Sequence, residues 1–175
     1  EIRADRVDHN PPTAVTAPLF KAFTPKGSLE EWKKAINFYN KPDMELHQFV
    51  IGLGFGSIFT DFTAVNGAIC HIFSPESGIG KTTALQAAMS IWGDPTKLLL
   101  KESDTVNSKM NRAELYNNIM LALDEMTNSH PKEISDFAYQ YTSGMQRNRL
   151  TMSSNQERVR GEPWKQIAVS TGNTS

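Results

Sequence analysis

The sequence is poor in cysteine, in long apolar runs and in net charge, and each shortage excludes a class of protein. Its 175 residues include one cysteine, Cys70, which excludes a fold held together by internal disulfides and suits a reducing cytoplasm. No apolar run approaches the roughly 20 residues of a membrane-spanning helix, so we expect no membrane segment. The formal net charge of −1 and the 39% of hydrophobic residues are typical of a soluble globular domain with one core.

The most informative motif that is present runs from Ser74 to Thr83 and has the pattern of a phosphate-binding loop. It follows an apolar run, 68–73, which predicts a buried strand, and it precedes 84–92, which predicts a helix. Strand, glycine-rich loop, Lys-Thr and helix are the context that a P-loop requires. Gly78 and Gly80 allow the positive φ angles that turn backbone N–H groups toward a polyphosphate.

Side chains in this loop extend the prediction to a nucleoside triphosphate, ATP, bound with Mg²⁺. Lys81 brings a positive charge to the β- and γ-phosphates, Thr82 offers a hydroxyl to Mg²⁺, and the helix N-terminus adds free donors. The predicted nucleotide-binding residues are Ser77, Gly78, Ile79, Gly80, Lys81, Thr82 and Thr83. Pro75 stands where the pattern has its first glycine, at the start of the loop, where fewer phosphate contacts are made. The alternative is a chance Gly-x-Gly-Lys-Thr in an ordinary loop.

A second motif is an apolar run, 118–123, that ends in Asp124 and Glu125. Continuous hydrophobicity predicts a central strand of a parallel sheet, and such sheets bind ligands at the carboxyl ends of their strands. We therefore expect Asp124 to hold Mg²⁺ and Glu125 to orient and deprotonate the attacking water. The alternative is that the two carboxylates only cap the next helix.

A third strand is predicted over 164–169, followed by Ser170, Thr171, Gly172 and Asn173. A polar residue after the strand beside the Asp-Glu strand would contact the γ-phosphate or position the water. Asn173 fits this sensor role best, and Ser170 and Thr171 are the alternatives. The predicted catalytic residues are thus Glu125, Lys81 and Asn173.

The three motifs predict an α/β P-loop NTPase core with a mostly parallel sheet flanked by helices. We expect an extended segment over 1–27, a helical lead-in over 28–66, and the core over 67–175, C-terminally incomplete because it stops after the sensor strand. Further expected elements are a helix capped by Ser28, an apolar helix over 44–59, a strand over 97–101, a helix from Asn107 or Ser108 to Tyr116, and a helix over 129–144 that His130 caps.

Basic residues gather near the carboxyl end of the sequence. Residues 145–175 carry five basic and two acidic side chains: Arg147, Arg149, Arg158, Arg160, Lys165, Glu157 and Glu162. The two stretches 146–152 and 157–161 predict the arms of a hairpin that turns near Ser154. Clustered arginines neutralise nucleic-acid phosphates, so Arg147, Arg149, Arg158 and Arg160 are candidate DNA contacts. The alternatives are a solvated hairpin or arginines that reach the nucleotide of a neighbouring subunit.

The order of these motifs resembles the domain of unknown function 927 family, from about residue 27 to the end. The residues that carry the resemblance are Ser28-Leu29-Glu30-Glu31-Trp32, the Gly-Lys-Thr-Thr loop, Ser90-Ile91-Trp92-Gly93, Leu123-Asp124-Glu125, Pro131-Lys132-Glu133, Trp164 and Ser170-Thr171-Gly172. The family comprises helicase-like P-loop ATPase domains of phage, prophage and mobile-element proteins, often attached to primase modules. The layout is also similar to superfamily 3 replicative helicases, which form rings and move on single-stranded DNA.

The resemblance implies an ATP-dependent DNA helicase or translocase domain of a phage or mobile-element replication protein. Its implied partners are single-stranded or forked DNA, further copies of the chain in a ring such as a hexamer, and a primase module in the same polypeptide. It implies the bacterial host cytoplasm if the protein is phage-encoded, and an arginine finger for which Arg147, Arg149 and Arg158 are candidates. Two residues depart from the family pattern. Pro75 replaces the first glycine of the loop, and Asn173 stands where many relatives carry an acidic residue. The alternative function is a regulatory or defence ATPase that acts as a nucleotide switch on a protein partner.

Overall fold

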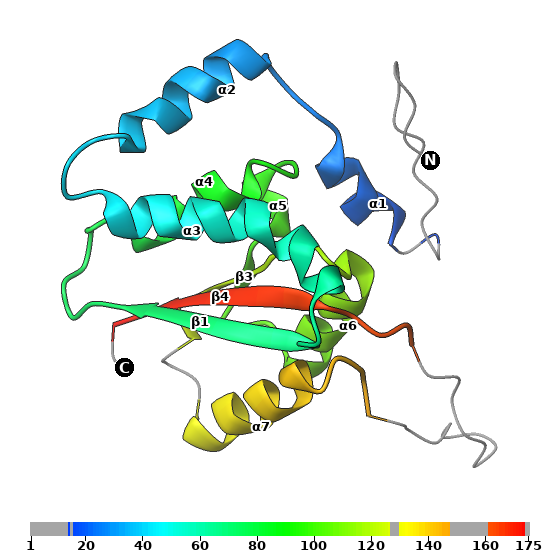
Figure 1. Cartoon of the computed structure of the whole chain (residues 1–175). Coiled ribbons are helices and arrows are strands. Elements are labelled where there is room, and N and C mark those ends of the chain that lie inside the picture. The colour runs from blue at the N-terminus through cyan, green and yellow to red at the C-terminus, as the bar shows by residue number, and fades with distance from the viewer. Residues whose placement is uncertain (1–13, 15, 127–129, 148–160, 174–175) are drawn as a thin grey trace.

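Four parallel strands form one sheet in the order β1-β4-β3-β2 (Figure 1). The computed structural model describes residues 14, 16–126, 130–147 and 161–173. The strands are β1 (Gly67–Phe73), β2 (Leu100–Lys101), β3 (Leu121–Asp124) and β4 (Gln166–Gly172). The predicted α/β class with a parallel sheet flanked by helices is confirmed.

Helices cover both faces of this sheet. They are α1 (Ala17–Phe20), α2 (Leu29–Ile36), α3 (Glu45–Gly56), α4 (Lys81–Met89), α5 (Pro95–Leu98), α6 (Val106–Tyr116) and α7 (Pro131–Thr142), with 3₁₀ turns η1 (Lys21–Phe23), η2 (Asn37–Tyr39) and η3 (Ser57–Phe62). Helices α3 and α4 pack together on one face, and α7 lies against the other (Figure 1). None of the helices in the described ranges is long and apolar enough to cross a membrane.

The strand order brings the predicted motifs to one edge of the sheet. From β1 the chain crosses to β2 at the far edge, returns through β3, and ends in β4, which lies between β1 and β3. Strand β4 pairs with β1 from Gly67↔Gln166 to Phe73↔Gly172 and with β3 through Leu123↔Ser170. Because all strands are parallel, the carboxyl ends of β1, β4 and β3 are neighbours, which is where such sheets bind ligands.

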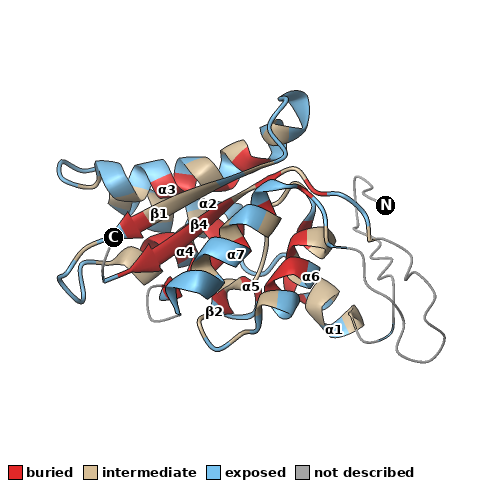
Figure 2. Cartoon of the chain, turned by 90° about the horizontal axis from the view of Figure 1, so that it is seen from below, coloured by how far each residue is buried: buried red, intermediate tan, exposed pale blue. Residues whose placement is uncertain are grey.

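The sheet is buried because helices cover it on both sides. Leu121, Ala122 and Leu123 of β3 are at most 1% exposed, and Ala168 and Val169 of β4 are fully buried. Figure 2 shows this burial along β4. An apolar run without polar alternation is typical of a strand with both faces covered, which explains why the run before Asp124 predicted β3 correctly.

The amino-terminal segment differs from the extended chain that we expected. Residues 17–23 form α1 and η1, because Pro18 stands in the first turn, where the missing N–H of proline costs nothing. Ala22 is buried, and its carbonyl accepts a hydrogen bond of 2.8 Å from the Asp94 backbone N–H. A Cβ atom on Gly93 would overlap this carbonyl. The segment therefore docks on the core at a point that only glycine allows.

The strand predicted over 97–101 is wrong for most of its length. Residues Pro95–Leu98 form α5, and only Leu100 and Lys101 pair with β3 as β2. The Asp94 side chain caps α5 by accepting a hydrogen bond of 3.2 Å from the Thr96 backbone N–H. An N-cap followed by proline is a helix start, and it outweighs the β-propensity of the apolar residues that follow.

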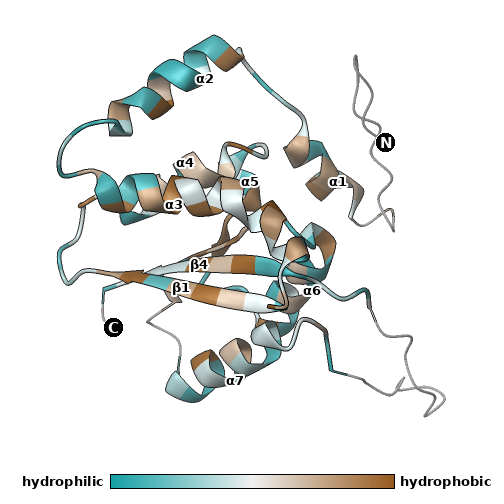
Figure 3. Ribbon diagram, viewed as in Figure 1, coloured by the Kyte–Doolittle hydropathy of each residue, from teal (hydrophilic) through white to brown (hydrophobic). Residues whose placement is uncertain are grey.

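Within the lead-in, helix α2 contacts the rest of the domain mainly through an aromatic side chain, Trp32. Ser28 caps α2 as predicted, by accepting a hydrogen bond of 3.2 Å from the Glu31 N–H. Trp32 donates a hydrogen bond of 2.8 Å to the Ser90 hydroxyl, and its ring lies edge-on to Phe55 at 6.2 Å. Most of α2 is hydrophilic (Figure 3), and none of its residues is fully buried.

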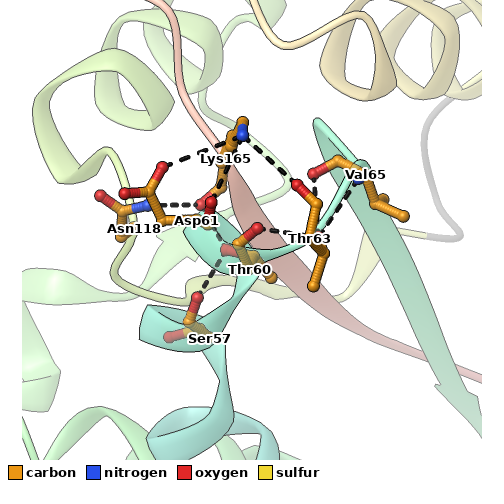
Figure 4. Close-up of polar contacts among 7 residues, drawn as sticks. All are labelled: Ser57, Thr60, Asp61, Thr63, Val65, Asn118 and Lys165. Carbon is orange, nitrogen blue, oxygen red and sulfur yellow. Dashed lines mark hydrogen bonds and ion pairs between the residues drawn. The ribbon is translucent and has the colours of Figure 1, made fainter.

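A polar cluster joins η3 to the start of β4, at the opposite end of the sheet from the predicted site (Figure 4). The Thr60 hydroxyl donates to the Lys165 carbonyl at 2.5 Å, and the Asn118 amide donates to the same carbonyl at 3.0 Å. The Lys165 ammonium donates to the carbonyls of Asp61 and Thr63 at 3.4 and 3.3 Å. The lead-in and β4 are thereby held together by hydrogen bonds that do not involve the site.

Candidate functional site

The predicted phosphate loop connects β1 to α4 with the backbone geometry that its glycines require. Gly78 and Gly80 have φ angles of 81° and 91°, in the left-handed region that disfavours residues with a Cβ atom. Gly80 is the N-cap of α4, so the helix begins at Lys81 rather than at residue 84, where the sequence predicted it. The free N–H groups and the positive end of the α4 dipole therefore lie at the loop.

A pocket of about 170 Å³ brings the three motifs together. It is lined by Ser77, Gly78, Ile79, Gly80, Lys81, Thr82, Thr83, Asp124, Glu125, Thr171, Gly172 and Asn173. All the residues predicted to bind nucleotide or metal, and all those predicted to be catalytic, are among them. This volume is smaller than the roughly 300–1,000 Å³ that is usual for pockets that hold a whole small molecule.

Asp124 is held by two hydroxyl groups from different elements. Thr82 at the start of α4 donates to Asp124 Oδ1 at 2.9 Å, and Thr171 of β4 donates to the same oxygen at 2.7 Å. No hydrogen bond from the described residues reaches Oδ2. The arrangement orients the carboxylate and leaves one oxygen available to a cation.

Thr82 and Asp124 fit a Mg²⁺ ion of the kind that proteins bind together with nucleotide phosphates. Magnesium takes oxygen ligands and usually binds through one or two carboxylates together with substrate phosphates. Thr82 and Asp124 supply a hydroxyl and a carboxylate that are already in contact. No group of three or more His, Cys, Asp or Glu side chains gathers within the described residues, so that part of the chain holds no all-protein metal cage.

Lys81 has all three of its N–H donors engaged. Its ammonium donates to the carbonyls of Ser74 and Glu76 at 3.0 and 2.9 Å and to Asn173 Oδ1 at 3.2 Å. Pro75 lies between the two carbonyls, and a proline there removes an N–H but no acceptor. The loop thus holds the lysine beside the pocket despite its departure from the glycine pattern.

Glu125 has an unusual backbone conformation. Its φ angle is 57°, which costs a residue with a Cβ atom about 1–2 kcal/mol. Its N–H donates to the Thr171 hydroxyl at 3.2 Å, and its side chain is exposed. Strain of this kind persists only where neighbouring contacts hold the residue in place, and Thr171 provides one such contact.

The three sensor candidates at the end of β4 make hydrogen bonds to different partners. Asn173 contacts Lys81, and Thr171 contacts Asp124 and Glu125. The Ser170 hydroxyl instead forms a 2.8 Å hydrogen bond with His71 Nδ1, because successive side chains of a strand point to opposite faces. Ser170 therefore lies outside the pocket, and Thr171 takes part in it together with Asn173.

His47 lies behind the phosphate loop, and nothing in the sequence predicted it there. Its Nε2 lies 3.2 Å from the carbonyl oxygen of Ile79, and a Cβ atom on Gly80 would come within 2.9 Å of the same nitrogen. Its Nδ1 is buried without a hydrogen-bond partner, which costs on the order of 1–3 kcal/mol. No pattern in the sequence connects residues 47 and 79, because the contact depends on how α3 packs on α4.

The predicted DNA-binding hairpin falls largely outside the described residues. Arg149, Arg158 and Arg160 lie there, and Arg147 is an exposed residue after α7. Their contact with DNA stays a prediction. His130 caps α7, as expected, by accepting a hydrogen bond of 3.3 Å from the Lys132 N–H.

A larger cavity of about 600 Å³ lies away from these motifs. It is lined by Thr24, Pro25, Lys26, Gly27, Ser28, Leu29, Trp32, Phe55, Ser90, Ile91, Gly93, Asp94 and Pro95. It borders the far end of α4 from the phosphate loop and contains none of the predicted site residues. We therefore assign the candidate site to the smaller pocket, where hydroxyl, carboxylate and ammonium groups converge.

Comparisons with known proteins agree with this description of the fold. A search of curated proteins found no match. A solved structure described as "SCCmec type IV Cch - active helicase" superposes with a TM-score of 0.63 at 23% identity, covering 87% of this chain. The superposition covers 28% of that helicase, so this chain spans less than a third of its length. The likeness supports the P-loop-like core. The sequence also matches the family described as "Domain of unknown function (DUF927)" over residues 13–161, which is most of the chain. The chain therefore belongs to the DUF927 family.

Proposed function

We propose that this domain binds ATP with Mg²⁺, hydrolyses it, and uses the energy to translocate on or unwind DNA in a phage or mobile-element replication protein. The observation that carries the proposal is the contact of Thr82 and Thr171 with Asp124, directly beside the loop that bears Lys81. A glycine-rich loop without a phosphate-binding role is not expected to lie against the carboxyl end of a strand that ends in Asp124. This convergence argues against a chance motif.

Nucleotide binding would depend on the loop and on Lys81. The loop N–H groups and the N-terminus of α4 supply donors and partial positive charge for the phosphates. Lys81 would exchange its hydrogen bonds with Ser74, Glu76 and Asn173 for phosphate oxygens, so binding replaces three existing contacts. Thr82 and Asp124 would hold Mg²⁺, which, when bound, neutralises charge that develops on the phosphate oxygens.

Hydrolysis would depend on Glu125 and on the end of β4. Glu125 is exposed at the pocket and would orient the attacking water and accept its proton. Thr171 fixes both acidic residues through one hydroxyl, by donating to Asp124 and accepting from the Glu125 N–H. Asn173 contacts Lys81 and so would respond when Lys81 turns to a phosphate.

The motor part of the proposal is supported by the likeness to a structure described as an active helicase and by family membership. We infer single-stranded or forked DNA as the partner, with Arg147, Arg149, Arg158 and Arg160 as its contacts. A ring of copies would let an arginine from a neighbouring subunit reach the nucleotide, and the family resemblance suggests a primase module in the same polypeptide. The setting would be the bacterial host cytoplasm.

The test is ATP turnover with and without single-stranded DNA. We expect DNA to stimulate turnover, and the double variant Arg147→Ala, Arg149→Ala to lose that stimulation. A matched control is Lys33→Ala, Lys34→Ala on the exposed face of α2, which removes two positive charges elsewhere and should keep the stimulation. Turnover that DNA leaves unchanged would refute the motor and favour a nucleotide switch. Absence of ATP binding would refute the proposal as a whole.

A further inference from the structure

Helix α3 of the lead-in contacts the phosphate loop through His47. The carbonyl of Ile79 only accepts hydrogen bonds, so His47 Nε2 carries the hydrogen and donates it over 3.2 Å. The residues that line the 170 Å³ pocket include none from the lead-in, and His47 lies next to two of them, Ile79 and Gly80. This contact links α3 to the loop that is proposed to bind phosphates.

The imidazole ring of His47 is also held by stacking on Tyr39. The ring centres lie 5.7 Å apart, with an angle of 23° between the planes. Tyr39 is itself held by α3, because the Gln48 amide donates to the Tyr39 carbonyl at 2.7 Å. Nδ1 is buried and has no hydrogen-bond partner among the described residues. The hydrogen bond to Ile79 is thus the polar contact that the ring makes.

Holding the Ile79 carbonyl also orients the next N–H group. The peptide between Ile79 and Gly80 is planar and trans, so its C=O and N–H point in opposite directions. A carbonyl held toward α3 directs the N–H of Gly80 away from α3. Gly80 is the N-cap of α4 and has a φ angle of 91°, a conformation that the loop needs if its donors are to face a phosphate. A Cβ atom on Gly80 would lie 2.9 Å from His47 Nε2, so His47 also leaves no room for a side chain at this position.

We propose that His47 is a positioning residue for the phosphate loop, which keeps the Ile79–Gly80 peptide in the orientation that binds a triphosphate before the nucleotide arrives. The proposal rests on the proposed ATP function. It assigns to the lead-in a part in nucleotide affinity, and it makes α3 a route by which movement of the lead-in changes that affinity.

The test compares His47→Phe, which keeps a stacking ring and removes the donor, with His47→Gln, which keeps a side-chain N–H donor. Losing one hydrogen bond that orients the loop should raise the KM for ATP about five- to tenfold with little change in kcat. Amide hydrogen exchange over residues 77–83 without nucleotide should become faster in His47→Phe. His47→Gln should restore both quantities toward the wild-type values. His130→Phe is the matched control, because it removes another histidine contact to the backbone and is not among the residues that line the pocket.

The outcomes separate this inference from the function on which it rests. If the wild-type protein binds no ATP, the proposed function fails, and the exchange experiment alone still decides whether His47 orders the loop. If the wild-type protein binds ATP and His47→Phe matches it in KM and in loop exchange, the positioning role is refuted. It is also refuted if His47→Gln behaves like His47→Phe, because the donor then has no effect.

Discussion

The hydroxyl of Thr171 should contribute strongly to both the stability and the chemistry of the site. Thr171 is 1% exposed, donates to Asp124 at 2.7 Å and accepts from the Glu125 N–H at 3.2 Å. Thr171→Val keeps the shape of the side chain and removes both hydrogen bonds. It leaves Asp124 with Thr82 as its one remaining donor among the described residues.

The size of the effect follows from these two contacts. A hydrogen bond to a charged group contributes about 1.5–3 kcal/mol and a neutral one about 0.5–1.5 kcal/mol, so the free energy of unfolding should fall by about 2–4 kcal/mol. For a chain of this length, each kcal/mol shifts the melting temperature by about 2–4 °C, which predicts a decrease of roughly 5–15 °C. Turnover of ATP should also fall, because both acidic residues lose their fixed positions.

Denaturant unfolding and thermal melting measure the stability directly, without assuming that the protein is an ATPase. Thr171→Ser is the control, because it keeps the hydroxyl and loses one methyl group, at a cost of about 0.5–1.5 kcal/mol. A double-mutant cycle with Asp124→Ala isolates the shared contact, and the coupling should be about 1.5–3 kcal/mol. Equal stability of Thr171→Val and wild type, or a coupling near zero, would refute the reasoning.

Three further changes test other parts of the structure. Glu125→Gln should lower kcat at least 10²-fold while the Kd for ATP changes by only a few fold, which single-turnover kinetics and calorimetry can separate; a full rate would exclude Glu125 as the base. Gly80→Ala should weaken ATP binding more than tenfold, because alanine disfavours a φ of 91° and its Cβ atom would crowd His47; unchanged titration calorimetry would contradict this. Burial raises the pKa of Tyr141 well above its usual value, so its hydroxyl stays protonated in the folded state while the unfolded state ionises near pH 10. Stability should therefore fall as the pH rises above about 10, and Tyr141→Phe should remove part of that fall and also relieve a buried hydroxyl without a partner; denaturation at pH 8 and 11 checks both effects.

The parts of the site that could be predicted from the sequence are those encoded within short segments. The loop at Gly80 and Lys81 is preceded by an apolar run and followed by a helical one, so its context is visible within some twenty residues. The same holds for Asp124, because a short continuous apolar run before it is typical of a strand that is buried on both faces. The parallel sheet follows, since strands that alternate with helices pair in parallel.

What the sequence did not predict depends on packing between distant segments. Thr171 was only one of three sensor candidates, and its contact with Asp124 requires β4 to lie beside β3. His47 had no signal at all, because the distance from α3 to the loop is set by the fit of α3 on α4. Gly54 contributes to that fit, since a Cβ atom there would lie 2.9 Å from Ile91 Cδ1.

The errors at residues 17–23 and 97–101 have a common cause. The prolines of 1–27 indicated an extended segment, and the apolar residues of 97–101 indicated a strand without regard to Pro95 before them. Pro18 and Pro95 instead stand in the first turn of short helices, where proline favours a helix start. Helices of one turn have too few residues for an apolar period to reveal them.

The contact between Gly93 and the backbone of Ala22 has a consequence for how the sequence can change. Any residue larger than glycine at position 93 would collide with the backbone of Ala22 and Phe23 and push η1 away from the core, although position 93 does not line the phosphate pocket. Natural variants should therefore conserve this glycine as strictly as a catalytic residue. A survey that ranks positions by conservation alone would then assign Gly93 to the catalytic site, although its role is to pack against the amino-terminal segment.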